Sequence, residues 1–135
     1  MSTTKGIVTL LVAAAAGLTQ GGAFAQTPAR FSGVASVYSE DYSGQTANGE
    51  QYDPQQFTAA HPTLPFGTLL RVSDPCNEHS VTVVINDRGP FIAGRVLDLS
   101  LAAAKALGMI DQGLMIVTAA VQQPKAFRLR DLLSN

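Results

Sequence analysis

The sequence predicts a mainly β protein: a small closed barrel of five or six short strands with one short helix. Short segments rich in β-branched and aromatic residues recur between turn-forming residues, and one segment has the composition of a helix. Strands and helices do not alternate along the chain, so a parallel sheet with crossover helices is disfavoured. Closing such strands into a barrel buries one side of each and removes exposed sheet edges. A length of 135 residues suits one domain.

The first 25 residues are predicted to be a signal peptide, outside the folded domain. Lys5 supplies a positive start, residues 7–18 are apolar and Ala-rich, and Ala23-Phe24-Ala25 puts small residues where signal peptidase cleaves, before Gln26. The apolar run is shorter than the roughly 20 residues needed to cross a bilayer. No Cys follows it to carry a lipid. We therefore expect an exported protein of the periplasm or cell envelope, soluble after cleavage and without a stable membrane anchor.

Charge and the few metal-binding side chains exclude several classes of function. Removing residues 1–25 takes away one Lys and no acid, so the formal charge changes from −1 to −2, and no nucleic-acid partner is expected. A single Cys excludes a disulfide-stapled scaffold, and Cys76 lacks the partnered arrangement of a thiol nucleophile. His61 and His79 are not at metal-ligand spacing. We expect a monomer that uses neither a metal nor a cofactor.

The first half of the domain contains three predicted strands and one long loop. Residues 31–38 combine β-branched and aromatic residues and are expected to form the first strand. Residues 39–53 hold two glycines and many polar side chains, which is typical of a surface loop that carries function. Residues 57–60 form a short strand that ends at His61-Pro62, and a Pro-Phe-Gly turn leads into the strand 68–73.

The second half contains the remaining strands. Residues 74–79 are polar and turn-forming and are expected to connect a hairpin. The strand 80–86 has Val81, Val83 and Ile85 on one face and Val84 on the other, so we expect burial on much of both sides. Residues 95–99 form another short extended segment.

One helix and a last strand complete the domain. Ser100 is the expected N-cap, with Asp98 also assigned to capping, and Gly108 stops the Ala-rich helix 101–107. Residues 114–121 are apolar on both faces and form the last strand. The domain is expected to span residues 26–122, followed by a tail at 123–135.

Several motifs taken together resemble the rare lipoprotein A (RlpA)-like family of septal-ring lytic transglycosylases. They occur in the family's order at residues 33–38, 46–50 (TANGE), 59–68 (AAHPTLPFGT), 86–91 (NDRGPF) and 95–100. Motifs in register are far more specific than one alone. The resemblance implies a six-stranded double-psi β-barrel, shared with expansins. It also implies lytic transglycosylation of peptidoglycan, with a preference for glycan strands that lack stem peptides.

The chain departs from the family pattern in three places. Many members carry a lipid-attachment Cys and a carboxy-terminal domain that binds denuded septal glycan, and this chain shows neither. The loop before Thr46 is slightly short, with Tyr42-Ser43-Gly44-Gln45 where members often have an aromatic and a basic residue. Targeting to the septum by the family's route is therefore not expected.

Asp87 is the predicted catalytic acid/base. A lytic transglycosylase needs one carboxyl group, because the 6-hydroxyl of the N-acetylmuramyl ring attacks its own anomeric carbon and closes a 1,6-anhydro ring. Asp87 lies at the end of an apolar strand before a Gly-Pro turn, which suits a half-buried carboxyl, and the resemblance supports this role. The competing structural interpretation is that Asp87 pairs with Arg88 or caps the turn.

The remaining site residues rest mainly on the resemblance. Glu50 and His61 are expected at the active site, Glu50 as a second carboxylate or substrate-orienting group and His61 as a hydrogen-bonding partner of the sugar or of Asp87. Without the resemblance, both are ordinary polar residues of loops. Substrate binding is assigned to Tyr38, Tyr42, Thr46, Asn48 and Arg88, with core packing an equal alternative for Tyr38.

Two other functions remain open from the sequence. An expansin-like protein would bind wall glycan without cutting it, which the small size of the chain favours. A hydrolase would use Glu50 and Asp87 as a carboxylate pair and leave reducing ends in place of anhydro ends.

Overall fold

The chain forms six strands and one helix in a computed structural model, which describes residues 29–122. The predicted signal peptide and the tail at 123–135 lie outside the described residues. The elements in chain order are β1 (Arg30–Val37), β2 (Thr58–Ala60), β3 (Leu69–Ser73), β4 (Ser80–Asp87), β5 (Arg95–Leu99), α1 (Leu101–Leu107) and β6 (Leu114–Val121). Each predicted strand is confirmed to within about two residues at its ends.

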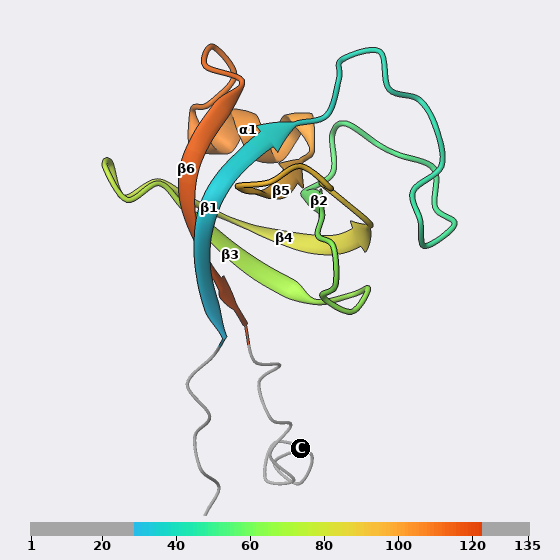
Figure 1. The fold of residues 1–135 in the computed structure, drawn as a ribbon. Helices are drawn as coiled ribbons and strands as arrows, with labels where there is room; N and C mark the ends of the chain where they lie inside the picture. Colours follow the sequence, from blue (N-terminus) through green and yellow to red (C-terminus); the bar gives the residue numbers. More distant parts are fainter. Residues whose placement is uncertain (1–28, 123–135) are drawn as a thin grey trace, which may run out of the picture.

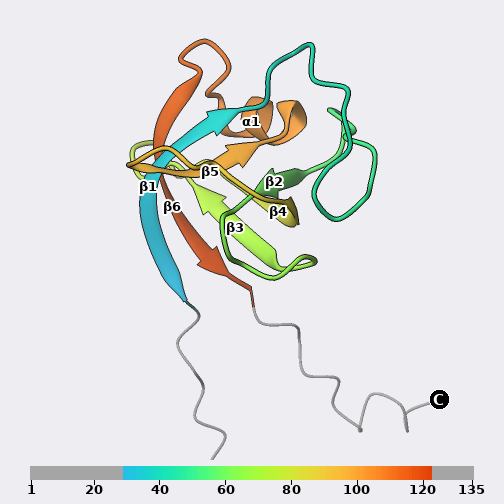
Figure 2. The same ribbon diagram turned by 45° about the vertical axis from the view of Figure 1, so that its right-hand side comes forward.

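The strands close into a barrel in the order β1-β5-β2-β4-β3-β6. Two neighbouring pairs are parallel, β1 with β5 and β2 with β4, and the other four pairs are antiparallel. The hairpin between β3 and β4 has its connection at the predicted residues. Figures 1 and 2 show β1 and β6 as long, bent strands that run side by side along one flank of the barrel. The expected closed six-stranded barrel is thus confirmed.

Alternation along β4 puts one face into the barrel and the other toward solvent. Val81, Val83 and Ile85 are buried, as expected from the period of two along a strand. Val84 is 37% exposed, so the prediction that both faces of this strand are buried is wrong. The reason is that only one face of a barrel strand meets the core, and nothing covers the outer face at Val84.

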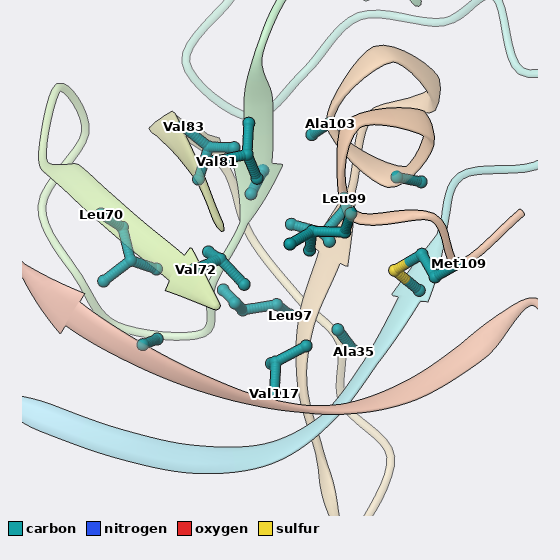
Figure 3. Close-up of a cluster of buried hydrophobic side chains, with 14 of the residues drawn as sticks. Ala35, Leu70, Val72, Val81, Val83, Leu97, Leu99, Ala103, Met109 and Val117 are labelled. Carbon is teal, nitrogen blue, oxygen red and sulfur yellow. The ribbon is translucent and has the colours of Figure 1, made fainter. Parts of the chain in front are cut away.

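The core fills the barrel with aliphatic side chains from every strand and closes at one end under α1. Figure 3 shows these side chains pointing toward one another in the barrel, with Ala103 of α1 at the helix end. Leu70, Leu97 and Leu99 are fully buried. Burying a side chain of this size contributes about 1.5–3 kcal/mol, so the barrel interior is the main source of stability.

Helix α1 begins and ends at the predicted residues. The Ser100 hydroxyl accepts a hydrogen bond from the Ala103 N–H, and Gly108 adopts a left-handed conformation (φ 73°) that ends the helix. Asp98 does not cap the helix: its carboxylate forms an ion pair with Arg95 (3.1 Å) and accepts from the Ser36 hydroxyl. The capping role predicted for Asp98 is wrong because the residue lies inside β5.

Two loops meet at the end of β4. The long loop between β1 and β2 covers residues 38–57 and projects to one side in Figure 1, while residues 61–68 connect β2 to β3. In residues 29–122, no helix has the length and hydrophobicity to span a membrane.

Candidate functional site

Asp87 is the last residue of β4, and its half-buried carboxylate accepts three hydrogen bonds. Oδ1 accepts from the backbone N–H of Ala47 (2.8 Å) and of Arg88 (2.8 Å). Oδ2 accepts from the Tyr38 hydroxyl. Three donors, two of them fixed in the backbone, hold the carboxyl group in one orientation.

The two oxygens of Asp87 are not equivalent. Oδ1 has two lone pairs in the plane of the carboxylate, and two N–H donors occupy them. Oδ2 accepts from Tyr38, and no second donor within residues 29–122 reaches its other lone pair. A proton is therefore most readily taken up and delivered at Oδ2.

Three tyrosines support the Oδ2 side of the carboxylate. The ring of Tyr38 stacks on Tyr52 (centroids 4.6 Å apart, 29° between planes), and Tyr42 packs against both at 5.3 and 5.4 Å. Burial raises the pKa of the Tyr38 hydroxyl well above its usual value, and the hydrogen bond to Asp87 and the charge of that carboxylate raise it further. Tyr38 therefore keeps its proton and remains a donor.

Tyr52 is a site residue that the sequence analysis missed. It is 6% exposed, and its hydroxyl accepts from the Leu101 N–H at the start of α1 (3.2 Å). Burial raises the pKa of the Tyr52 hydroxyl, and the hydrogen bond from Leu101 lowers it by a smaller amount. The residue joins the long loop to the helix and positions Tyr38, and its place two residues after the TANGE motif was the available signal.

The loop 45–52 carries Glu50 and is folded by local side-chain hydrogen bonds. Asn48 Oδ1 accepts from the Thr46 hydroxyl (2.5 Å) and from the Glu50 N–H (3.1 Å), and Asn48 Nδ2 donates to Glu50 Oε1 (2.6 Å). Thr46 is buried, whereas Glu50 is exposed. Thr46 and Asn48 thus shape the loop and leave the Glu50 carboxylate accessible to solvent.

His61 is joined to Asp87 through the backbone, and its ring faces elsewhere. The His61 N–H donates to the Asp87 carbonyl (3.2 Å). Nδ1 of the imidazole accepts from the N–H groups of Thr63 (3.0 Å) and Leu64 (2.9 Å), and the ring lies 5.1 Å from Phe31. Among the described residues, no hydrogen bond joins the imidazole to the Asp87 carboxylate.

The imidazole of His61 is held in its neutral form. Partial burial lowers its pKa, and the charge of Arg88 lowers it further. Because Nδ1 accepts two hydrogen bonds, the proton of the neutral ring is on Nε2, which is left as a donor.

Arg88 holds the connection between β2 and β3 against the end of β4. Its Nη1 donates to the carbonyls of Leu64 (2.7 Å) and His61 (3.2 Å), and its guanidinium lies 4.0 Å over the Phe66 ring. No ion pair joins Arg88 to Asp87 within the described chain. Phe66, a further residue that the sequence analysis did not assign to the site, supplies the stacking surface.

The structure thus places all three predicted catalytic residues on segments attached to one strand end. Asp87 is half-buried as predicted, Glu50 lies on the loop that donates to it, and the His61 backbone lies beside it. Tyr38 contacts Asp87, while the hydroxyl of Tyr42 donates to the Gln45 carbonyl (2.9 Å) and the ring is 37% exposed. Within residues 29–122, no group of three His, Cys, Asp or Glu side chains is arranged to hold a metal ion.

A family model described as lytic transglycolase matches residues 30–119. The chain is 54% identical over 86 residues to the "Probable endolytic peptidoglycan transglycosylase RlpA" of Nostoc sp., covering 62% of this chain and 23% of that protein. It is 53% identical over 85 residues to the endolytic peptidoglycan transglycosylase RlpA of Pseudomonas aeruginosa, covering 62% of this chain and 25% of that protein. The chain spans about a quarter of the length of these curated relatives.

Two solved structures share the fold. The Streptomyces papain inhibitor has a TM-score of 0.59 and 24% identity, covering 73% of this chain and 98% of the inhibitor. The Clavibacter michiganensis expansin has a TM-score of 0.57 and 23% identity, covering 73% of this chain and 52% of the expansin. These likenesses confirm the expected double-psi β-barrel.

Proposed function

Because this chain belongs to the lytic transglycolase family, whose model matches residues 30–119, we propose that it is an endolytic peptidoglycan lytic transglycosylase. It cleaves the bond between N-acetylmuramyl and N-acetylglucosaminyl residues, leaves 1,6-anhydro ends, and acts on glycan that lacks stem peptides. The observation that carries the proposal is the Asp87 carboxylate, held by three donors with one lone pair of Oδ2 free. The place of action is the periplasm or cell envelope.

Asp87 is the acid/base of the reaction. When protonated at Oδ2, it gives its proton to the glycosidic oxygen as the bond to the anomeric carbon breaks. The resulting carboxylate then takes the proton of the N-acetylmuramyl 6-hydroxyl as that oxygen bonds to the anomeric carbon. The proton count balances, and no water is consumed.

Tyr38 and the backbone of the loop stabilise Asp87 after it has given up its proton. The charge that appears on the carboxylate meets the Tyr38 hydroxyl and the Ala47 and Arg88 N–H groups, which are already in place. Donors that need no reorganisation lower the barrier for a step that creates charge.

Glu50 supplies the second carboxylate of the site. Its exposed side chain orients substrate hydroxyls and favours the positive charge that develops on the sugar ring. His61 offers its Nε2–H to the sugar. Arg88 holds the connection 61–68 in the shape that receives the glycan, and Thr46 and Asn48 do the same for the loop 45–52. Arg88 and Tyr42 lie at the edge of this glycan-binding surface.

Digestion of amidase-treated sacculi tests the proposal. The protein is incubated with purified sacculi whose stem peptides have been removed, and the soluble fragments are analysed by mass spectrometry. Anhydro-muramyl ends are expected from the wild type and not from Asp87→Asn. Reducing ends would identify a hydrolase instead. Retention on sacculi without any fragments would identify a glycan-binding protein of the expansin type.

A further inference from the structure

A groove separate from the Asp87 site lies on the outer face of the barrel, across β1, β6 and β3. It has a volume of about 750 Å³. Its charged lining residues are Arg30 and Arg71, and hydroxyl groups of Ser32, Ser73 and Thr118 lie in its lining together with Ala120. Figures 1 and 2 show β1 and β6 side by side on this flank.

The strand register explains why the surface is hollow between two cations. Arg30 is opposite Ala120 in β6, and Ala120 is opposite Arg71 in β3, so the three side chains stand on one face. Two strand spacings separate the arginine backbones by about 10 Å. Ala120 forms a low floor between two long side chains.

A parallel row of hydroxyl groups lies two residues further along the same face. Ser32 is opposite Thr118, which is opposite Ser73. Hydroxyl groups both donate and accept hydrogen bonds, which suits the hydroxyl and acetamido groups of a sugar. The groove therefore offers two cations beside a row of three hydroxyl groups that can form hydrogen bonds with a sugar.

Within residues 29–122, neither arginine has an acidic partner. No acidic residue of this part of the chain lines the groove, and its ion pair is Arg95 with Asp98, elsewhere in the barrel. Arg71 Nη2 donates to the Ser80 hydroxyl of β4 (3.1 Å), and its other N–H groups have no hydrogen-bond partner among residues 29–122. Planar guanidinium groups pair well with carboxylates.

We propose that this groove binds the free lactyl carboxylates of N-acetylmuramyl residues in a glycan strand. Each disaccharide of peptidoglycan carries one lactyl group, and its carboxyl is tied up in an amide while the stem peptide is present. Removal of the peptide by an amidase releases one negative charge per disaccharide. Arg30 and Arg71 then recognise stripped strands by this carboxylate, which is attached through the lactyl group directly to the sugar ring. This inference rests on the proposed function, whose substrate it deepens.

The groove lies well away from the reacting atoms. Arg71 is opposite Thr82 in β4, and Asp87 is five residues further along that strand, which corresponds to roughly 16 Å. Substitutions at Arg30 and Arg71 therefore change glycan binding and leave the contacts of Asp87 intact.

Equilibrium binding in the Asp87→Asn background tests the groove without cleavage. Labelled strands from amidase-treated sacculi are compared with the same strands after conversion of their carboxylates to methylamides, using fluorescence anisotropy. Exposed ion pairs each contribute little to binding. We therefore expect the two arginines together to make the free-carboxylate strands bind only about tenfold more tightly than the methylamide strands. Arg30→Gln with Arg71→Gln removes this preference.

Lys105→Gln is the matched control, since Lys105 is an exposed cation on α1 outside the groove, and it keeps the preference. Equal affinity for both strand preparations, or a preference that survives the double substitution, overturns the proposal. So does equally tight binding of polyglutamate, which would show general attraction of anions. Because binding is measured without cleavage, a wild type that releases no anhydro ends refutes the enzymatic activity and leaves the groove result standing.

Discussion

Replacing Tyr38 with Phe removes one atom from the site, the hydroxyl oxygen that donates to Asp87 Oδ2. The ring remains stacked on Tyr52 at 4.6 Å. A hydrogen bond to a charged group contributes about 1.5–3 kcal/mol, and the half-buried position of this pair places it near the lower value. About 1.5 kcal/mol corresponds to a rate effect of about tenfold. In thermal unfolding, the same loss lowers the midpoint by about 6–12 °C for a domain of this size.

The assay is the rate at which anhydro-muramyl ends form on stripped glycan, measured over a range of substrate concentrations. We expect kcat to fall about tenfold with KM unchanged, since Tyr38 acts on the carboxylate and not on the bound sugar. Tyr42→Phe is the control: it removes the same atom from the same aromatic cluster, where the hydroxyl contacts the Gln45 carbonyl. Equal kcat values for the two variants would refute the positioning role. A change confined to KM would instead favour sugar stacking by Tyr38.

Three further outcomes follow from particular contacts. The lowered pKa of His61 favours its neutral form in the folded state, so its contribution to stability is present above about pH 6.5 and is lost as the pH falls through the folded pKa. His61→Asn should weaken this acid sensitivity in urea unfolding, and His79→Gln, at an exposed residue, should not. Ser100→Ala should lower the free energy of unfolding by about 1–2 kcal/mol in denaturant titrations, and a change below about 0.5 kcal/mol would contradict its capping role. Gly33→Ala places a Cβ 2.4 Å from Val96 Cγ1 and should cost about 1–3 kcal/mol; Val96→Ala should relieve part of it, and strict additivity in the double-mutant cycle would argue against the clash.

Local signals predicted the elements of the barrel, because each depends on neighbours in the sequence. The alternation of Val81, Val83 and Ile85 marked the buried face of β4, and Ser100 and Gly108 marked both ends of α1. The order in which the strands close is a long-range property, and it came from the family resemblance and not from residue patterns. Exposure of Val84 was not predictable from hydrophobicity, since one valine on the outer face of a strand has no sequence signature of its own.

The sequence motifs named residues that the fold brings together at the end of β4, but they did not predict the contacts between them. Motifs identified Asp87 and Tyr38, but no pattern shows that the hydroxyl of one meets the carboxylate of the other across 49 residues of sequence. Tyr52 and Phe66 escaped prediction for the same reason, because their roles come from stacking on side chains brought together by the fold. The catalytic and substrate-binding roles remain predictions for all of the assigned residues: Asp87, Glu50, His61, Tyr38, Tyr42, Thr46, Asn48 and Arg88.

The backbone at the end of β4 holds both loops through bonds that do not involve the Asp87 side chain. Three successive carbonyls of this strand accept from the two loops. Ile85 accepts from Gly67 (2.8 Å) and Asp87 from the N–H of residue 61 (3.2 Å), both in the connection 61–68, and Asn86 accepts from Asn48 (3.2 Å) in the long loop. None of these bonds uses the Asp87 side chain. In Asp87→Asn, the amide oxygen can still accept the two N–H groups that Oδ1 accepts, so both loops should stay in place. Loss of anhydro ends in that variant, in a protein that still unfolds in one cooperative transition, would then report on the loss of proton transfer.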